Sequence, residues 1–382
     1  MDDSNLSLSE RLLPLDTLRG LLMVLMAIDH ARYFIAKEHP GEFWGISLPQ
    51  YESTIAFLTR FVTHFCAPGF FFLMGAGIVL FATSRSSRGW STARIRQWLI
   101  TRGGLLIALQ LLIENPTWLL GTLRGEPLAP TPPGQGASVL FHFGVLYALG
   151  ACMVISSLFI KLRSRMLGAL AILAILVTPL FTPASDLAGV AFSPFLRLLI
   201  IAGRTGIMQV YYPLIPWLAP TLMGMIYGQG CLRTDREVYG KGAVIGALFL
   251  ILFFLIRLQG GFGNLHPPSN LGWIALLNVT KYPPSLAFLL LTLGVNLVLL
   301  WMLAKIGEEK GNRLVVFGQA ALFFYIIHLY LYSLLSLVIG RATSLGFMYG
   351  LWAISILCLY PVCNWYREFK QRKDVGSLWR LL

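Results

Sequence analysis

The chain has 382 residues, of which 56% are hydrophobic and 12% are charged, and its mean hydropathy is +0.70. Because a soluble domain carries about 25% charged residues, this composition excludes soluble globular, disordered, collagen-like and disulfide-rich secreted proteins. Runs of about 20 apolar residues recur along the chain instead. They predict an all-α fold, that of a polytopic integral membrane protein in contact with membrane lipid.

The net charge of +13 comes mainly from basic residues in or beside short loops between apolar runs. This distribution is typical of the cytoplasmic loops of membrane proteins, so we expect no nucleic-acid partner. The five cysteines are scattered, and the sequence has no CxxC pair, HExxH motif or zinc-type Cys/His spacing. We therefore expect buried free thiols, no metal site and no permanently bound cofactor.

Windows of about 20 residues predict ten membrane-spanning helices. They cover residues 17–36, 57–82, 95–113, 138–160, 166–181, 208–229, 241–258, 283–304, 315–338 and 346–366. Residues 192–207 could add an interfacial or re-entrant helix, which would make eleven. Pro68 and Pro216 are predicted kink points. No small-residue cleavage site follows the first apolar run, so we expect that helix to remain as an uncleaved anchor.

The charges of the loops predict the orientation in the membrane. Residues 32–52 and 114–126 each carry a net charge of −1, whereas the segment from Arg85 to Arg102 carries +5. Residues 161–165 carry +3, and so does the C-terminal segment from residue 367. Since short basic loops face the cytoplasm, we expect a cytoplasmic segment 1–16, a transmembrane domain 17–366 and a basic cytoplasmic tail 367–382.

The first predicted helix carries ionisable residues that are costly in a bilayer and are therefore candidates for function. Asp16 and Arg19 are three residues apart and can pair on one helix face. Arg19 and His30 are eleven residues apart, which is about three helical turns, so both project from the same face roughly 16 Å apart. Met23 and Met26 lie between them on or near that face.

This arrangement suits group transfer across a membrane. A fixed cation at the inner end can bind a phosphate group. A histidine at the outer end can remove a proton from a hydroxyl or an amine, because its pKa is ordinarily near neutral. Asp29 could orient His30, although neighbours on a helix do not face each other. The structural alternative is an arginine and a histidine that merely reach the membrane interfaces.

Several motifs resemble one family, in the same order along nearly the whole chain. They are RLLPLDTLRGLLMVLMAIDH (11–30), THFCAPGFFFLMGAG (63–77), PLIPWLAPTLMGMIYG (213–228), NVTKYPPSLAFLLLTLG (278–294) and FGQAALFFYIIHLYL (317–331). Together they resemble a bacterial member of the heparan-alpha-glucosaminide N-acetyltransferase catalytic-domain family. The spacing of Arg19 and His30 is also similar to that of acyltransferase family three.

The resemblance implies an acetyltransferase or acyltransferase in a bacterial inner membrane. Acetyl-coenzyme A or another acyl-coenzyme A would be the cytoplasmic donor, and an envelope saccharide the acceptor on the outer side. By motif position, His30 would be the catalytic histidine, with Asp29 beside it, and Arg19 would be the arginine of the superfamily.

Other polar residues in apolar segments are candidate acceptor contacts, because each is costly to bury. They are Arg60 and His64 on the second predicted helix, Glu114 and Asn115 at the end of the third, His142 at the start of the fourth and His328 in the ninth. Each has an ordinary alternative as an interfacial residue, a helix end or a hydrogen-bonded core histidine.

Basic residues are candidate donor contacts. Arg85 and Arg88 belong to a cluster that could clamp the phosphates of coenzyme A, although membrane topology alone also explains the cluster. Lys281, before two prolines, could bind an anion or simply reach the interface. Cys66 could carry the acyl group in a two-step reaction, or be a buried thiol. Gly75 and Gly77 predict close packing between helices.

The sequence thus predicts a membrane acyltransferase in which His30 acts as general base. The alternative is a transport protein: a transporter or flippase that uses His30 and Arg19 as a proton and anion relay. A structural or assembly protein is a third. No feature of the sequence indicates an oligomeric state.

Overall fold

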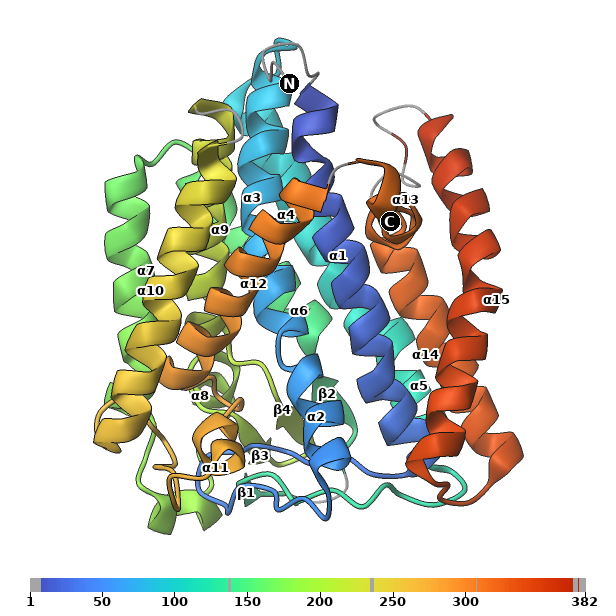
Figure 1. The fold of residues 1–382 in the computed structure, drawn as a ribbon. Coiled ribbons are helices and arrows are strands. Elements are labelled where there is room, and N and C mark those ends of the chain that lie inside the picture. Colours follow the sequence, from blue (N-terminus) through green and yellow to red (C-terminus); the bar gives the residue numbers. More distant parts are fainter. Residues whose placement is uncertain (1–7, 137–138, 234–236, 307, 374–376, 378–382) are drawn as a thin grey trace.

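The structure is a computed structural model that describes residues 8–136, 139–233, 237–306, 308–373 and 377. It is a bundle of apolar helices that run roughly side by side, with a small sheet at one end (Figure 1). The N-terminal end of the first helix lies at the opposite end from that sheet. Predictions for residues 1–7, 374–376 and 378–382 fall outside the described residues.

The longer helices form the bundle. In chain order they are α1 (Leu8–Ala31), α2 (Thr54–Thr63), α3 (Cys66–Ser86), α4 (Thr92–Leu109), α6 (Val145–Ser156), α7 (Ser164–Phe181), α9 (Leu214–Arg233), α10 (Glu237–Gln259), α12 (Leu286–Ile306), α13 (Glu308–Gln319), α14 (Ala321–Ile339) and α15 (Leu345–Gln371). The shorter helices are η2 (Arg32–Ala36), η3 (Gln110–Glu114), α5 (Asn115–Thr122), η4 (Ser157–Phe159), η5 (Ser185–Gly189), α8 (Pro194–Leu199) and α11 (Trp273–Leu277). Of these, η2 and η3 are π-helical.

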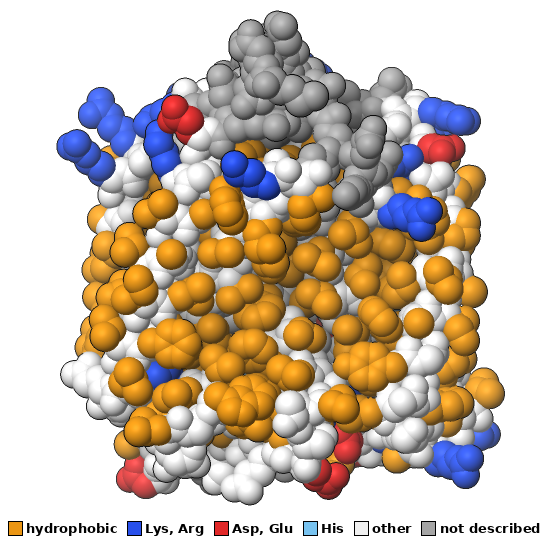
Figure 2. All heavy atoms as spheres, in the orientation of Figure 1, with side chains coloured by type: hydrophobic (Ala, Val, Ile, Leu, Met, Phe, Trp, Pro, Cys, Tyr) orange, Lys and Arg blue, Asp and Glu red, His pale blue; other side chains and the backbone are white. Residues whose placement is uncertain are grey.

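Apolar side chains cover the middle of the molecule as a broad band, and charged side chains lie at its two rims (Figure 2). In the described part of the chain, seven helical stretches are long and apolar enough to cross a membrane. They are Thr54–Ser86, Thr92–Thr122, Ser164–Phe181, Glu237–Gln259, Leu286–Ile306, Ala321–Ile339 and Leu345–Gln371. These features indicate an integral membrane protein, whereas the predicted count of ten or eleven spans is not confirmed.

The structure differs from the sequence prediction at several boundaries. Residues 192–207 contain the six-residue α8 and a strand rather than a further spanning helix. A break between α2 and α3 confirms the kink predicted at Pro68, because proline removes the hydrogen bond to the residue four positions earlier. The kink predicted at Pro216 is wrong, because this residue lies in the first turn of α9, where a missing N–H is tolerated.

A small sheet accompanies the helices, so the all-α prediction describes the bundle but omits this element. Its strands are β1 (Gly134–Gln135), β2 (Phe141–Phe143), β3 (Gly203–Thr205) and β4 (Met208–Val210). Their order is β1-β3-β4-β2, with β3 and β4 antiparallel and the outer strands parallel to their neighbours. Strands of two or three residues are too short to show a period of two in the sequence.

The helices α3 and α9 pack closely because glycine stands where they cross. A Cβ atom at Gly75 would overlap the carbonyl oxygen of Thr221, and one at Gly224 would overlap that of Phe72. The predicted close packing is thus confirmed at Gly75. At Gly77 it is wrong, because nothing lies within 4 Å of a Cβ built there.

The contact at Gly75 gives a prediction about stability. We expect Gly75→Ala to lower the free energy of unfolding by roughly 1–3 kcal/mol, because the added methyl group must push the backbone of α9 away. The matched control is Gly104→Ala on α4, where a Cβ meets no atom within 4 Å. Thermal unfolding in detergent should show a lower Tm for the first variant only. Equal Tm values for the two variants would contradict the close crossing.

Candidate active site

Arg19 is held in place by contacts within α1 and to α13. Its Nη1 donates to Asp16 Oδ1 at 2.7 Å, which confirms the predicted pair. The same nitrogen lies 3.4 Å from the carbonyl oxygen of Gly318, and Gln319 Nε2 donates to Asp16 Oδ2 at 3.1 Å. The guanidinium is therefore fixed between two helices at one end of the bundle.

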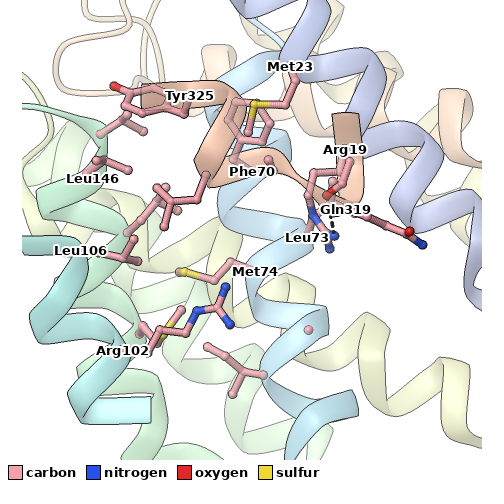
Figure 3. Close-up of a pocket in the computed structure, with 18 of the residues that line it drawn as sticks. Arg19, Met23, Phe70, Leu73, Met74, Arg102, Leu106, Leu146, Gln319 and Tyr325 are labelled. Atoms are coloured by element: carbon pink, nitrogen blue, oxygen red, sulfur yellow. Dashed lines mark hydrogen bonds between the residues drawn. The ribbon is translucent and has the colours of Figure 1, made fainter. Parts of the chain in front are cut away.

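Arg19 lines a cavity of about 330 Å³, which we name the Arg19 cavity. Arg102, Gln319 and Lys370 are its other strongly polar lining residues. Its walls between the polar end and Tyr325 are apolar and rich in methionine, including Met23, Met26, Met74 and Met153. Figure 3 shows Arg102 and Tyr325 at opposite ends of this cavity, with Arg19 beside Gln319.

His30, near the C-terminal end of α1, is paired with His328 of α14. Its Nδ1 lies 2.7 Å from His328 Nε2, and the planes of the two rings are within 15° of parallel. His328 Nδ1 lies 2.7 Å from the carbonyl oxygen of Phe324, which can only accept. His328 Nδ1 therefore carries a proton. When His328 is neutral, its Nε2 must accept from His30 Nδ1, and His30 Nε2 is left with a free lone pair.

His30 lines a second cavity, of about 90 Å³, which we name the His30 cavity. Most of its lining side chains are aromatic or ionisable; they include Asp29, Tyr33, His39, Glu114, Trp118, His142, Tyr211, Tyr212 and Tyr282. Val145 and Tyr325 line both this cavity and the Arg19 cavity. The two cavities therefore share a wall next to His30, whose ring centre lies 6.0 Å from that of Tyr325.

A buried ion cluster adjoins the His30 cavity. Arg60 is fully buried and donates from Nη1 to Asp29 at 2.5 Å, and from Nε and Nη2 to both oxygens of Glu42 at 2.8 and 2.7 Å. His64 Nε2 lies 3.2 Å from Glu42 Oε1. Burial alone would raise the pKa of Glu42, but the charge and hydrogen bonds of Arg60, with His64, hold this pKa well below its ordinary value.

The contacts of the cluster place its members relative to the His30 cavity. Arg60 reaches Asp29 of the first helix, but neither Arg60 nor His64, both candidate acceptor contacts, lines the His30 cavity. Asp29 pairs with Arg60, and the ring of His30 is oriented by His328 instead. Arg60 and His64, at the end of α2, therefore link this helix to the Glu42 loop, and Arg60 also links it to α1. These contacts lie behind the cavity wall.

Lys281 lies with this cluster and not with Arg19. It is buried, its backbone N–H donates to the carbonyl oxygen of Glu42 at 3.0 Å, and its Nζ lies 5.1 Å from the centre of the Tyr282 ring. The sequence could not predict that Lys281 contacts Glu42, because the two residues lie in loops that are distant in the chain.

Glu114 and Asn115 stand at the junction of η3 and α5 and do not end a helix, since Thr92–Thr122 forms one continuous helical stretch. Both are buried. Glu114 Oε1 accepts from Trp118 Nε1 at 3.0 Å, and Gln110 Nε2 donates to Asn115 Oδ1 at 3.3 Å. Glu114 lines the His30 cavity. The π-helical turn before it is a local irregularity of a kind frequent at functional sites.

His142 lies in strand β2 rather than at the start of a helix, and α6 begins only at Val145. Its side chain lines the His30 cavity, so this candidate acceptor contact shares the cavity with His30. Burial lowers the pKa of His142 to about 4, and the positive charge of Arg204 acts in the same direction. His142 is therefore neutral at physiological pH.

Three other candidates lie outside both cavities. Arg85 packs over the rings of Phe81 and Trp90, and Arg88 is exposed beyond the end of α3. Cys66 is buried and lines neither cavity. Arg102, which comes from the same basic cluster, is the arginine that reaches the Arg19 cavity.

Sequence reasoning missed several residues of the site. Tyr325 lies three residues before His328, and this helical spacing could have placed both on one face. Glu42 and His39 stand in the segment EHPGEFW, where two acids and a histidine close to aromatic residues offered a weak signal. Lys370 lies on α15, beyond the predicted end of the last span at residue 366.

Comparisons with known proteins agree with the sequence motifs. Residues 11–255 match the family described as heparan-alpha-glucosaminide N-acetyltransferase, catalytic. The chain is 31% identical over 147 residues to heparan-alpha-glucosaminide N-acetyltransferase of Mus musculus and 32% identical over 155 residues to that of Homo sapiens. These alignments cover 38% and 41% of this chain and 20% of each relative, so the match spans about a fifth of the length of these curated relatives.

The burial of His142 predicts how stability depends on pH. The unfolded chain binds a proton at this residue near pH 6.5, whereas the folded chain does so only near pH 4. Stability is therefore lost as the pH falls between these values, by roughly 2 kcal/mol at pH 5. We expect Tm to fall less between pH 7.5 and pH 5 for His142→Gln than for the unmodified protein. An equal fall in both would show that His142 is protonated in the folded state.

Proposed function

The chain belongs to the heparan-alpha-glucosaminide N-acetyltransferase catalytic family, and on that premise we propose that it transfers an acetyl group from acetyl-coenzyme A to an amine or hydroxyl of a saccharide. The observation that carries the proposal is the paired imidazole of His30 where two cavities meet. Two substrates that enter from opposite ends of the bundle can reach one base only at such a point.

The Arg19 cavity supports the donor assignment. Its polar end combines Arg19, Arg102 and Lys370, and guanidinium groups are well suited to bind phosphate. Its methionine-rich walls suit a long, flexible and largely uncharged arm such as that of coenzyme A. We place the phosphates at the polar end and the thioester near Tyr325. Arg85 and Arg88 then have no direct contact with the donor.

The His30 cavity supports the acceptor assignment. Asp29, Glu114 and His142 offer oxygen and nitrogen atoms for hydrogen bonds to sugar hydroxyls or an amine, and several aromatic rings provide flat surfaces for a sugar. Asn115 supports Glu114 through Gln110 and makes no direct contact in this proposal. Arg60, His64 and Lys281 act by holding Asp29 and the loop of Glu42 in place.

The chemical step follows from the orientation of the two imidazoles. His30 Nε2 takes the proton of the acceptor amine or hydroxyl while the nucleophile attacks the thioester carbonyl carbon. The tetrahedral intermediate collapses as the carbon–sulfur bond breaks, and the protonated His30 returns its proton to the sulfur of coenzyme A. His328 accepts the hydrogen bond from His30 Nδ1 throughout, so it fixes the tautomer that the reaction needs.

The proposal includes an orientation in the membrane. We place the Arg19 end, and with it both ends of the chain, on the cytoplasmic side, where acetyl-coenzyme A is made. Basic side chains at the rim on the N-terminal side of the bundle support this choice (Figure 2). The loops that carry His39, Glu42 and His142 then face the opposite side, where the saccharide is acetylated.

The roles of the two histidines can be tested with purified protein in detergent. We expect His30→Gln to lower the rate of coenzyme A release in the presence of an amino sugar by at least about 10²-fold. His328→Phe should lower it comparably, whereas His328→Gln should retain much of the rate, because a glutamine oxygen can still accept from His30 Nδ1. His266→Gln, outside the two cavities, is the matched control.

Two outcomes would contradict this assignment. Equal rates for His328→Phe and His328→Gln would show that His328 only fills space. Solute uptake by reconstituted protein without consumption of acetyl-coenzyme A would favour a transporter over an enzyme.

The donor site can be tested by kinetics with two arginine variants. We expect Arg102→Ala to raise KM for acetyl-coenzyme A about tenfold, because it removes one cation from the proposed phosphate site, with little change in KM for the saccharide. Arg88→Ala removes an exposed arginine from the same end of the molecule and should leave both constants unchanged. The reverse pattern would place the donor at the exposed basic loop instead of the Arg19 cavity.

A further inference from the structure

Val145 and Tyr325 belong to the wall between the Arg19 cavity and the His30 cavity, and among the described residues only these two line both. Tyr325 comes from α14, and its ring centre lies 6.0 Å from that of His30 and 5.8 Å from that of His328. Val145 is the first residue of α6 and is partly buried. One part of the wall is therefore an aromatic ring packed on the imidazole pair, and the other part is a small aliphatic side chain.

In the proposed reaction, the acyl carbon lies at this wall. A nucleophile that gives its proton to His30 Nε2 lies within roughly 3 Å of that atom, and the nucleophile and the acyl carbon approach to about 3–3.5 Å. The acyl carbon is therefore within about 6 Å of His30 Nε2. The rings of His30 and Tyr325 are separated by the same distance. The sulfur to which the acyl carbon is bonded remains on the side of the Arg19 cavity.

The four substituents of the acyl carbon in the tetrahedral intermediate leave little freedom to the acyl chain. The nucleophile points toward His30 and the sulfur points into the Arg19 cavity, so the oxygen and the rest of the chain take the other two directions. The arm of coenzyme A occupies the Arg19 cavity, and the acceptor occupies the His30 cavity, which measures about 90 Å³. An acyl chain longer than two carbons therefore meets the wall itself.

The position of Val145 is fixed by its neighbours. A Cβ atom built on Gly144 would lie 3.0 Å from Gln110 Oε1, so the start of α6 packs directly against η3. Strand β2 ends at Phe143, whose carbonyl oxygen accepts from the N–H of Tyr211 at 3.1 Å. Because close-packed interiors yield little to added volume, a wall held in this way does not move aside for a longer chain.

We propose that Val145 sets the length of the transferred acyl group: its side chain leaves room for the two carbons of an acetyl group and excludes longer chains. This inference rests on the proposed function. The nucleophile bonds to the acyl carbon as the carbon–sulfur bond breaks, and the proton passes by way of His30 to the sulfur of coenzyme A. Since this balance is the same for every acyl chain, the space at Val145 distinguishes the donors.

The test compares acetyl-, propanoyl- and butanoyl-coenzyme A as donors to glucosamine, with the full-length protein in detergent. One extra methylene in an apolar site typically changes kcat/KM about 10- to 200-fold, so we expect the wild type to prefer the acetyl donor over the propanoyl donor at least about tenfold. Val145→Ala removes two methyl groups, and we expect it to lower the acetyl-to-butanoyl ratio of kcat/KM at least about tenfold. Mass spectrometry of the acylated sugar identifies the group transferred.

Leu149→Ala is the matched control. Leu149 lies one turn after Val145 on the same face of α6 and is also partly buried, but it lines only the Arg19 cavity. This substitution widens the space for the arm of coenzyme A and leaves the shared wall intact. We expect KM for the three donors to change together, so that the acetyl-to-butanoyl ratio of kcat/KM stays within about twofold of the wild-type ratio.

Val145→Ile changes the wall in the opposite direction. It keeps the β-branched shape and adds one methylene, so we expect the acetyl-to-propanoyl ratio of kcat/KM to rise at least about fivefold. This variant gives a second measurement if Val145→Ala fails to fold, and the Tm of each variant is measured beside its kinetics. Equal use of acetyl and butanoyl donors by the wild type, or an unchanged ratio in a folded Val145 variant, would overturn the role of Val145. The same shift in Leu149→Ala would also overturn it.

Failure of the underlying function gives a different result. If the wild type releases no coenzyme A from any of the three donors, or if the release is insensitive to His30→Gln, the acetyltransferase proposal falls, and the role of Val145 falls with it. If acetyl transfer to glucosamine depends on His30 and only the chain-length pattern fails, the enzyme stands and the role of Val145 alone is wrong.

Discussion

A charge buried in an apolar bundle must be paired, and Arg60 is the residue on which the architecture of the site depends. Its guanidinium is fully buried and bound by Asp29 of α1 and by both oxygens of Glu42. Removal of one partner from such a pair typically costs about 3–5 kcal/mol, because the other charge remains unpaired. The cluster therefore fixes the loop after α1 against α1 and α2, and with it the wall of the His30 cavity.

This pairing also keeps the buried charges apart from the imidazole pair of His30 and His328. Asp29 and Glu42 are engaged by Arg60, whereas His30 is bound to the imidazole of His328, whose Nδ1 proton points to a backbone carbonyl. In the proposed mechanism, the base is thus oriented by a second imidazole and not by a carboxylate, and the Nε2 of His30 is left free. Arg102 lies at the opposite end of the Arg19 cavity from Tyr325, so in the proposed function the phosphates bind away from His30.

Sequence reasoning succeeded where the geometry is local. The pair of Asp16 and Arg19 follows from their spacing on one helix, and so does the shared face of Arg19 and His30, because helical periodicity alone sets both. It was wrong about the local structure of His142 and Glu114, because a three-residue strand and a π-helical turn leave no periodic signal. Lys281 was assigned to the donor, but its contact with the Glu42 loop depends on tertiary packing.

Composition and periodicity by themselves determined that this is a helical membrane protein whose first helix carries a cation and an imidazole on one face. Only the tertiary structure decided their partners. His328 lies 298 residues from His30 in the chain, and Glu42 meets Arg60 across a loop. The two residues that line both cavities, Val145 and Tyr325, come from α6 and α14, which are far apart in the chain. Contacts between distant segments depend on how helices cross and pack, and a pattern of residues along one segment does not encode that arrangement.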